Sequence, residues 1–180
     1  LHDALPIWLA IQAERGARGI ETWIVPQAEV AGDAAAGSIA FTATDAEAGT
    51  IYLYIANELV RVAVAAGDTA DTIGEAVEAA VTANRDLPVT AVNTAGTVAF
   101  TSKSKGPWGN DISLAVGNKG EVLPTGVSVV ITDMTGGTGT PDIQDALDAL
   151  GTEEAANEQY FTDAVHGYMQ DETTLDAIAN

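Results

Sequence analysis

The sequence contains no cysteine, only two histidines and only seven basic residues in 180. Without cysteine the chain can form no disulfide, no thiolate zinc site and no cysteine nucleophile. The two histidines, His2 and His166, leave little for a histidine-based metal site, and we expect no cofactor. No apolar run approaches the ~20 residues of a membrane-spanning helix, so we also expect no membrane insertion.

Basic charge is scarce relative to acidic charge. The chain has 26 acidic residues and a formal net charge of −19. Sequence-independent binding to nucleic acid requires clustered lysine and arginine, so we expect no direct nucleic-acid partner. Residues 134–180 hold ten acidic side chains and no basic one. Such a run is typical of a solvated face, and the functional alternative is a face that meets a basic partner or a neighbouring subunit. Because 47% of the residues are hydrophobic, the chain is expected to fold.

Both ends of the sequence look unlike those of a natural domain. Leu1 to Ile7 resemble one translated frame of a common sequencing adapter, so we expect these seven residues not to be gene product. Residues 8–18 then have the pattern of a helix, and residues 173–179 have the pattern of the start of another. We therefore expect an internal fragment of a longer protein.

The middle of the chain, residues 37–133, has the pattern of a compact β-rich lobe. Alternation of apolar residues predicts about seven strands, over residues 38–44, 50–56, 58–64, 89–93, 96–102, 111–116 and 126–132. The second strand places Ile51, Leu53 and Ile55 on one side, and its close spacing to the third strand predicts a hairpin. One main helix is predicted between the strands at 58–64 and 89–93, with Asp68 or Thr69 as its N-cap and an apolar stripe through Ile73 and Val77. The Ala/Gly-rich residues 28–37 are predicted to be a connection.

The outer parts of the chain alternate helix and strand. Their predicted elements are, in order, a helix at 8–18, a strand at 20–25, a helix at 140–150, a strand at 160–165 and a helix at 173–179. This alternation is typical of an α/β layer with a parallel sheet. The predicted fold class is therefore α+β: a β-rich module inserted into a partial α/β core domain, which is made of residues 8–36 and 134–180.

Three features have the composition of chemical sites, each with a simpler explanation. Gly136 to Gly139 precede a predicted helix and could cradle a phosphate, but they lack the lysine of a P-loop, and a hinge explains them better. Acidic pairs such as Asp68 with Asp71 match no calcium-loop pattern and suit helix starts. His166 ends a predicted strand, where α/β enzymes often place catalytic groups, but no nucleophile motif accompanies it.

The loop from Lys103 to Asp111 is the strongest candidate for an interaction site. It contains Lys103, Lys105, Trp108 and Asn110. An indole next to lysine can stack on a sugar or a nucleobase. Alternatively, Trp108 covers the core of the lobe while Asn110 takes part in a turn into the strand predicted at 111–116.

Several segments resemble, in the same order, the Mu-like tail sheath proteins of contractile-tailed phages. They are Trp23 to Pro26, Ala48 to Ile55, Val62 to Thr69, Gly106 to Ile112 and Tyr160 to Tyr168. The similarity runs from about Trp8 to Asn180. It implies a structural virion protein with an inner core and a variable outer inserted domain, which here would be residues 37–133.

The resemblance also implies a function and partners. A sheath subunit polymerises helically around the tail tube and contracts to drive genome delivery, without catalytic residues or cofactors. Its expected partners are neighbouring sheath subunits, the tail tube protein and the baseplate, and its location is the virion tail, after assembly in the host cytoplasm. Two other classes remain open from the residues alone: a glycan-binding, adhesin-like module that uses Trp108, Tyr52 and Tyr54, and an α/β enzyme fragment with His166.

Overall fold

The computed structural model of the chain describes residues 31–139, which lie within the compact unit Glu29–Pro141. We call the described residues the β lobe. The elements predicted at 8–18, 20–25, 140–150, 160–165 and 173–179, and with them the parallel sheet, lie outside the described residues. In the described part of the chain, no helix is long and apolar enough to cross a membrane.

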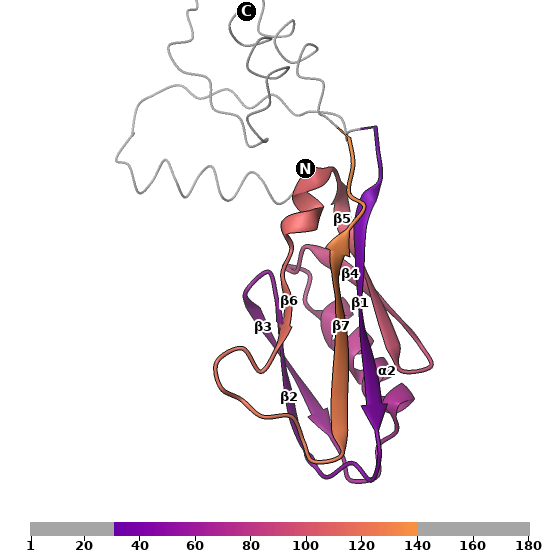
Figure 1. Ribbon diagram of the computed structural model, residues 1–180, viewed down its shortest axis with the longest axis vertical. Coiled ribbons are helices and arrows are strands. Elements are labelled where there is room, and N and C mark those ends of the chain that lie inside the picture. The colour runs from indigo at the N-terminus through magenta and orange to yellow at the C-terminus, as the bar shows by residue number, and fades with distance from the viewer. Residues whose placement is uncertain (1–30, 140–180) are drawn as a thin grey trace, which may run out of the picture. The chain divides into compact units, whose positions relative to one another are not determined.

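The β lobe consists of seven strands, one α-helix and one short 3₁₀ helix (Figure 1). In chain order they are β1 (Ala34–Ala43), β2 (Gly49–Ile55), β3 (Glu58–Val64), α2 (Ala70–Ala83), β4 (Val89–Thr94), β5 (Thr97–Lys105), η1 (Pro107–Asp111), β6 (Leu114–Val116) and β7 (Val127–Thr135). Seven strands with one main helix confirm the predicted α+β class for the described residues.

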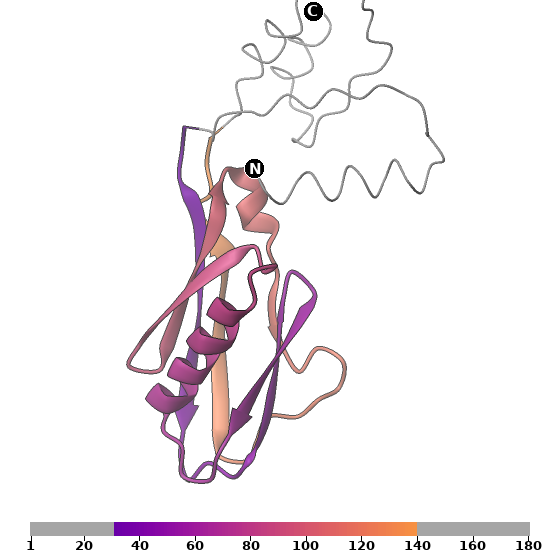
Figure 2. The same ribbon diagram turned by 180° about the vertical axis from the view of Figure 1, so that it is seen from behind.

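The strands form two antiparallel sheets. One has four strands in the order β4-β5-β1-β7, and the other has three in the order β3-β2-β6. β1 and β7 come from opposite ends of the lobe's sequence and run side by side in Figure 1. Helix α2 contacts β4, β1 and β5 of the first sheet and β3 of the second, as the view from behind shows (Figure 2). The three-stranded sheet and α2 together therefore cover one face of the four-stranded sheet.

Local sequence explains the two hairpins. β2 and β3 are joined through Ala56 and Asn57, and β4 and β5 through Ala95 and Gly96, all four with positive φ. Two-residue turns of this handedness match the twist of antiparallel strands. The predicted hairpin after residue 56 is confirmed, and β3 has the predicted bounds of 58–64.

The N-cap of helix α2 is Thr69, one of the two N-cap residues predicted from the sequence. Thr69 accepts a hydrogen bond from the N–H of Thr72, whose hydroxyl in turn accepts one from the N–H of Thr69, so the two residues form a capping box. Ile73, Val77 and Val81 face the core and are almost completely buried. The apolar stripe predicted from the sequence is therefore the buried face of the helix.

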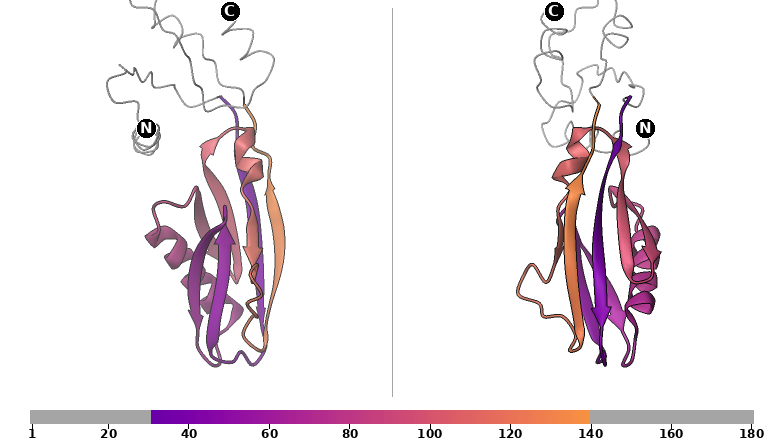
Figure 3. Two further views of the ribbon diagram at one scale, coloured as in Figure 1. Left: turned by 90° about the vertical axis from the view of Figure 1, so that its left-hand side faces the viewer. Right: turned by 45° about the vertical axis from the view of Figure 1, so that its right-hand side comes forward.

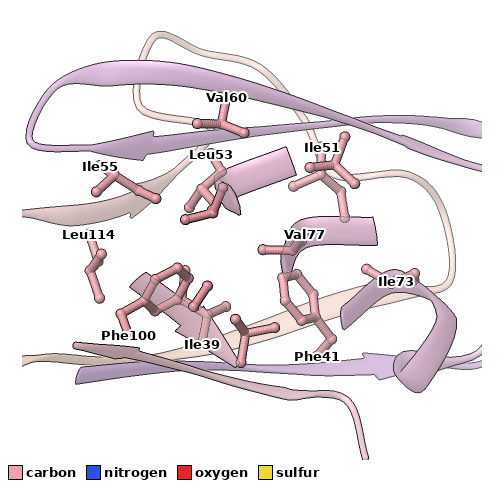
Figure 4. Close-up of a cluster of buried hydrophobic side chains, with 14 of the residues drawn as sticks. Ile39, Phe41, Ile51, Leu53, Ile55, Val60, Ile73, Val77, Phe100 and Leu114 are labelled. Atoms are coloured by element: carbon pink, nitrogen blue, oxygen red, sulfur yellow. The ribbon is translucent and has the colours of Figure 1, made fainter. Parts of the chain in front are cut away.

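The core lies between the two sheets and α2. Figure 4 shows the side chains that meet there: Ile39, Phe41 and Phe100 from the four-stranded sheet, Ile51, Leu53, Ile55, Val60 and Leu114 from the three-stranded sheet, and Ile73 and Val77 from α2. Burial of such side chains contributes ~1.5–3 kcal/mol each. The side of β2 that was predicted to be apolar, with Ile51, Leu53 and Ile55, is the core side.

Two predictions about local structure were wrong. Residues 34–37 were predicted as part of a connection, but they are the first part of β1, where Ala35 is fully buried and Gly37 lies against Met134. The strand predicted at 111–116 is shorter, because residues 107–111 form η1 and β6 begins at Leu114. Pro107 at the first position of η1 has the fixed φ that a helical turn requires.

Candidate functional site

The chain enters and leaves the β lobe at one place, which we call the neck: residues 33–35, η1 with Gly106, and residues 137–138. The N–H of Gly106 donates to the carbonyl of Asp33 (3.3 Å), and the N–H of Thr138 donates to the same carbonyl (3.0 Å). The N–H of Asp33 donates to Oγ1 of Thr138 (3.1 Å). These bonds connect the first, the last and the η1 segments of the lobe.

Three of the four candidate interaction residues lie at or beside the neck. Asn110 has an exposed side chain that bonds twice to Gly137: its Nδ2 donates to the carbonyl oxygen (3.0 Å), and its Oδ1 accepts from the N–H (2.8 Å). Lys105 is half-buried on β5 and pairs in register with Ala34 at the start of β1. The amide of Asn110 thus satisfies both polar backbone groups of Gly137.

Trp108 lies against the backbone of Gly106. Its side chain is half-buried, and its Nε1–H donates to Oγ of Ser104 (3.0 Å). Gly106 has a φ of +120°, and a Cβ added there would lie 2.3 Å from the indole ring. Only glycine fits beside the ring in this conformation. Trp108 thus packs against Gly106 of the neck and is half-buried, in contrast to the fully buried side chains of the core.

Lys103 serves a different part of the lobe. Its ammonium donates to the carbonyl of Arg85 (2.8 Å), and its backbone N–H donates to the carbonyl of Pro88 (2.8 Å). Both partners belong to the connection between α2 and β4. The structure therefore brings Lys105, Trp108 and Asn110 to the neck and joins the side chain of Lys103 to the α2–β4 connection.

Two backbone N–H groups in the run of residues 136–139 donate hydrogen bonds within the lobe. The N–H of Gly137 donates to Asn110, and the N–H of Thr138 donates to Asp33. These two groups are therefore not available to cradle a phosphate in this arrangement. The acidic pair Asp68 and Asp71 is likewise engaged: Asp68 accepts from the N–H of Ala65, and Asp71 accepts from the side chain of Asn93.

A further polar cluster was not predicted from the sequence. The hydroxyl of Tyr54 donates to Oε1 of Glu121 (2.5 Å), and the ammonium of Lys119 lies 5.4 Å from the centre of the Tyr54 ring. The backbone N–H of Lys119 also donates to Glu121 (2.8 Å). This cluster holds the loop of residues 117–126, which projects from the sheets in Figure 3, onto β2. Tyr54 and Glu121 are 67 positions apart in the sequence, so no local sequence pattern predicts the cluster.

The cluster changes the ionisation of both partners. The hydrogen bond from Tyr54 lowers the pKa of the Glu121 carboxyl, and this effect is opposed by partial burial. The same bond, together with burial and the negative charge of Glu121, raises the pKa of the Tyr54 hydroxyl. Tyr54 is only 2% exposed, so its ring is covered and cannot be a stacking surface for a glycan.

His166 and the acidic residues after residue 139 lie outside the described residues. Within residues 31–139, no group of three or more histidine, aspartate or glutamate side chains is placed to hold a metal ion. The polar side chains of the neck and of the Tyr54 cluster bond mainly to one another and to backbone groups. This arrangement serves to fix loops and chain connections in place.

No known family profile matches the sequence. The chain is 37% identical to the Mu-like prophage FluMu tail sheath protein of Haemophilus influenzae over 136 residues, which are 74% of its length. The chain spans 28% of the length of that relative.

Proposed function

Because this chain is a relative of a Mu-like tail sheath protein, we propose that it is part of the structural subunit of a contractile phage tail sheath. The subunit polymerises helically around a tail tube and contracts to drive genome delivery. The observation that carries this proposal is the 37% identity over 74% of the chain. A heterologous contact that does not close on itself generates a helical tube, which is the assembly that such a protein needs.

We further propose that the β lobe is the outer inserted domain of this subunit and that the flanking residues, 8–30 and 140–180, belong to its core. The neck supports the insertion, because the chain enters through Asp33 and leaves through Thr138 at the same place. A domain whose two connections are adjacent can be added to a scaffold without disturbing it. The strands at this place, β1 and β7, begin at Ala34 and end at Thr135.

The proposed partners are neighbouring sheath subunits, the tail tube protein and the baseplate, in a virion tail that assembles in the host cytoplasm. Contraction requires subunit contacts with two packings, of which the extended one is metastable. No step of this function requires a cofactor or a reaction at a catalytic residue, so we propose that the protein is not an enzyme.

The glycan-binding alternative has less support from the lobe. The indole N–H of Trp108 is bonded to Ser104, and the hydroxyl of Tyr54 is bonded to Glu121, so both of these polar groups have partners within the chain. Recognition of a sugar by stacking needs an exposed ring face with polar groups beside it. Loss of glycan binding on Trp108→Ala would favour this alternative, whereas the sheath role predicts no such binding.

Electron microscopy of the complete gene product that contains this chain tests the proposal. Purified protein at high concentration should form tubes with a regular helical repeat and a hollow centre, because sheath subunits associate through repeating contacts. If the protein stays monomeric under all conditions and no tubes form when tail tube is added, the sheath proposal is wrong.

A further inference from the structure

Tyr54 is buried for a different reason from its neighbours on β2. Leu53 and Ile55 are buried in the hydrophobic core, and successive side chains of a strand point to opposite faces of a sheet. Tyr54 therefore lies on the outer face of the three-stranded sheet, where it pairs in register with Leu59 and Ala115. Its side chain is buried although it does not belong to the core cluster, so another segment must cover it.

The loop of residues 117–126, which joins β6 to β7, provides this cover. The ammonium of Lys119 lies 5.4 Å from the centre of the Tyr54 ring, and Oε1 of Glu121 accepts the hydrogen bond from the Tyr54 hydroxyl. Both residues belong to the middle of the loop, residues 118–122, which we call the strap. The strap thus shields from solvent a ring that the two sheets by themselves leave on an outer face.

Both ends of the strap are anchored. On the side of β6, the N–H of Gly117 donates to the carbonyl of Tyr52 (3.0 Å). On the side of β7, Leu123 packs against the hydrophobic core cluster and Pro124 is buried. Neither anchor involves the Tyr54 hydroxyl or the Glu121 carboxylate, so both anchors remain if the contact between Tyr54 and Glu121 is lost.

The middle of the strap is attached at one point. In the described part of the chain, the one hydrogen bond that joins the strap to a strand is the bond between Tyr54 and Glu121. The other hydrogen bonds of the strap are local: the N–H of Gly120 donates to the carbonyl of Gly117, and the N–H of Lys119 donates to Glu121. A segment with few bonds to its surroundings opens at a lower free energy than the sheets beneath it.

The backbone of the strap can adopt other conformations once this bond is lost. Gly117 has a φ of +65° and Gly120 has a φ of +89°, and a glycine released from such a conformation has access to most of the backbone map. In the closed conformation the chain turns tightly, because a Cβ added at Gly117 would lie 2.5 Å from the carbonyl oxygen of Glu121. The bond between Tyr54 and Glu121 therefore holds closed a turn that is otherwise free to open.

We propose that the strap is an acid-sensitive latch: protonation of Glu121 opens residues 118–122 and exposes the ring of Tyr54, while the two sheets stay folded. A hydrogen bond from a hydroxyl to a carboxylate is roughly twice as strong as one between neutral groups, so protonation weakens the single attachment of the strap. The bond to Tyr54 lowers the pKa of Glu121 when the strap is closed. Closure is therefore fully favoured above the ordinary glutamate pKa of about 4.3 and is lost as the pH falls through the lowered value.

The neighbouring charges leave Glu121 as the group that responds to acid. Lys119 on the strap favours the charged carboxylate, whereas Tyr52 on β2 and Arg61 on β3 act on the hydroxyl of Tyr54. β6 (Leu114–Val116) has no titratable side chain. Glu121 is the one carboxylic acid among these groups, so it is the group that gains a proton in acid.

Trypsin digestion of the 180-residue chain at neutral pH tests the latch, because Lys119 is a cleavage site within the strap. When opening is fast, the rate of cleavage follows the population of the open form. Glu121→Gln keeps the shape of the side chain without its charge and so imitates the protonated state, and Tyr54→Phe removes the donor. Each variant should raise the rate of cleavage after Lys119 by roughly tenfold. The double variant should be cut no faster than the faster single variant, because both changes remove the same bond.

Two controls separate local opening from unfolding. Tyr52→Phe removes a hydroxyl from the same face of β2 and should leave the rate of cleavage after Lys119 unchanged. Cleavage after Arg61, in the middle of β3, requires the sheet to open and should stay slow in every variant. An equal rise in cleavage after Lys119 and after Arg61 overturns the inference, because the opening would then be global. So does cleavage after Lys119 that neither Tyr54→Phe nor Glu121→Gln accelerates.

Amide NMR spectra in acid test the trigger itself. At pH 3 the signals of residues 118–122 should move to random-coil positions, while the signals of β2 and β3 keep their native positions. In Glu121→Gln the strap signals should have the open positions already at neutral pH and should show no acid transition. Strap signals that stay native at pH 3, or that are lost together with those of β2 and β3, contradict the latch. Neither result bears on the sheath role, which is judged by whether the complete gene product forms tubes.

Discussion

Asp33 and Thr138 are 105 residues apart in the sequence and are joined by a hydrogen bond in each direction. The N–H of Asp33 donates to the hydroxyl of Thr138, and the N–H of Thr138 donates to the carbonyl of Asp33. This pair closes the β lobe at its neck. The lobe thereby has its own core and one point of attachment, which is the geometry expected of an inserted domain.

The β lobe should fold by itself when it includes the neck. A recombinant segment of residues 31–139 is expected to give dispersed amide NMR signals and a cooperative thermal transition. A segment of residues 37–133, the bounds first predicted, lacks buried Ala35 and Met134 as well as the bonds of the neck. It should be less stable by at least ~3 kcal/mol. Equal unfolding free energies for the two segments in urea would show that the neck contributes nothing.

Asn110→Asp should weaken the neck. The carboxylate can still accept from the N–H of Gly137, but it cannot donate to the carbonyl oxygen of Gly137. We expect a loss of ~1–3 kcal/mol of unfolding free energy in urea denaturation. Asn118→Asp makes the same change at an exposed position of the 117–126 loop and serves as the control. An equal effect of the two substitutions would contradict the role of Asn110.

Gly106→Ala should destabilise the lobe for two separable reasons. The φ of +120° is unfavourable for alanine, and the new Cβ would meet the indole of Trp108. The control is Gly67→Ala, because Gly67 also has a positive φ but has open space where the Cβ would lie. We expect ~1 kcal/mol for the control and clearly more for Gly106→Ala.

The steric part can be isolated with a second substitution. Gly106→Ala combined with Trp108→Ala should cost less than the sum of the two single changes, by ~1 kcal/mol or more, because the clash is then absent. Strictly additive unfolding free energies would mean that the indole does not restrict position 106.

The bond between Tyr54 and Glu121 should make stability depend on pH. The pKa of Glu121 is lowered in the folded state, so its contribution is present above the pKa of an unfolded glutamate, near 4.3, and is lost as the pH falls through the lower folded value. The pKa of Tyr54 is raised, so its contribution is present below the pKa of an unfolded tyrosine, near 10, and is lost as the pH rises through the higher folded value.

Thermal melts of Tyr54→Phe across pH measure this effect. The unfolding midpoint of the variant should lie below that of the unmodified chain near neutral pH, and the difference should shrink in strong acid as Glu121 becomes protonated. Tyr52→Phe, on the same strand and the same side, is the control. A difference for Tyr54→Phe that is constant with pH would contradict the assigned bond.

The sequence predicted those parts of the lobe that depend on local pattern. The alternation of Ile51, Leu53 and Ile55 with polar or aromatic residues identified the core side of β2, and Thr69 with the apolar stripe identified α2. The sequence pattern did not predict the first residues of β1. Ala34 to Gly37 have low strand propensity, and burial and strand pairing hold them in the sheet.

Features that depend on distant pairing were not predictable. The contact of Tyr54 with Glu121 and the neck bonds of Asn110 arise only when loops far apart in the sequence meet. The order and register of β4, β5, β1 and β7 likewise could not be deduced from the pattern of residues within each strand. The sequence predicted the loop that contains Trp108 as a candidate interaction site. It did not predict the hydrogen-bond partners of that loop, because these partners depend on η1 and on the neck.

A cryo-electron microscopy map of tubes formed by the complete gene product tests the central claim most directly. The account predicts a helical array in which the β lobe lies at the outer radius and joins the subunit core through two adjacent chain connections, at Asp33 and Thr138. A map in which the lobe lines the inside of the tube, or in which its two connections leave from opposite ends, would contradict the account.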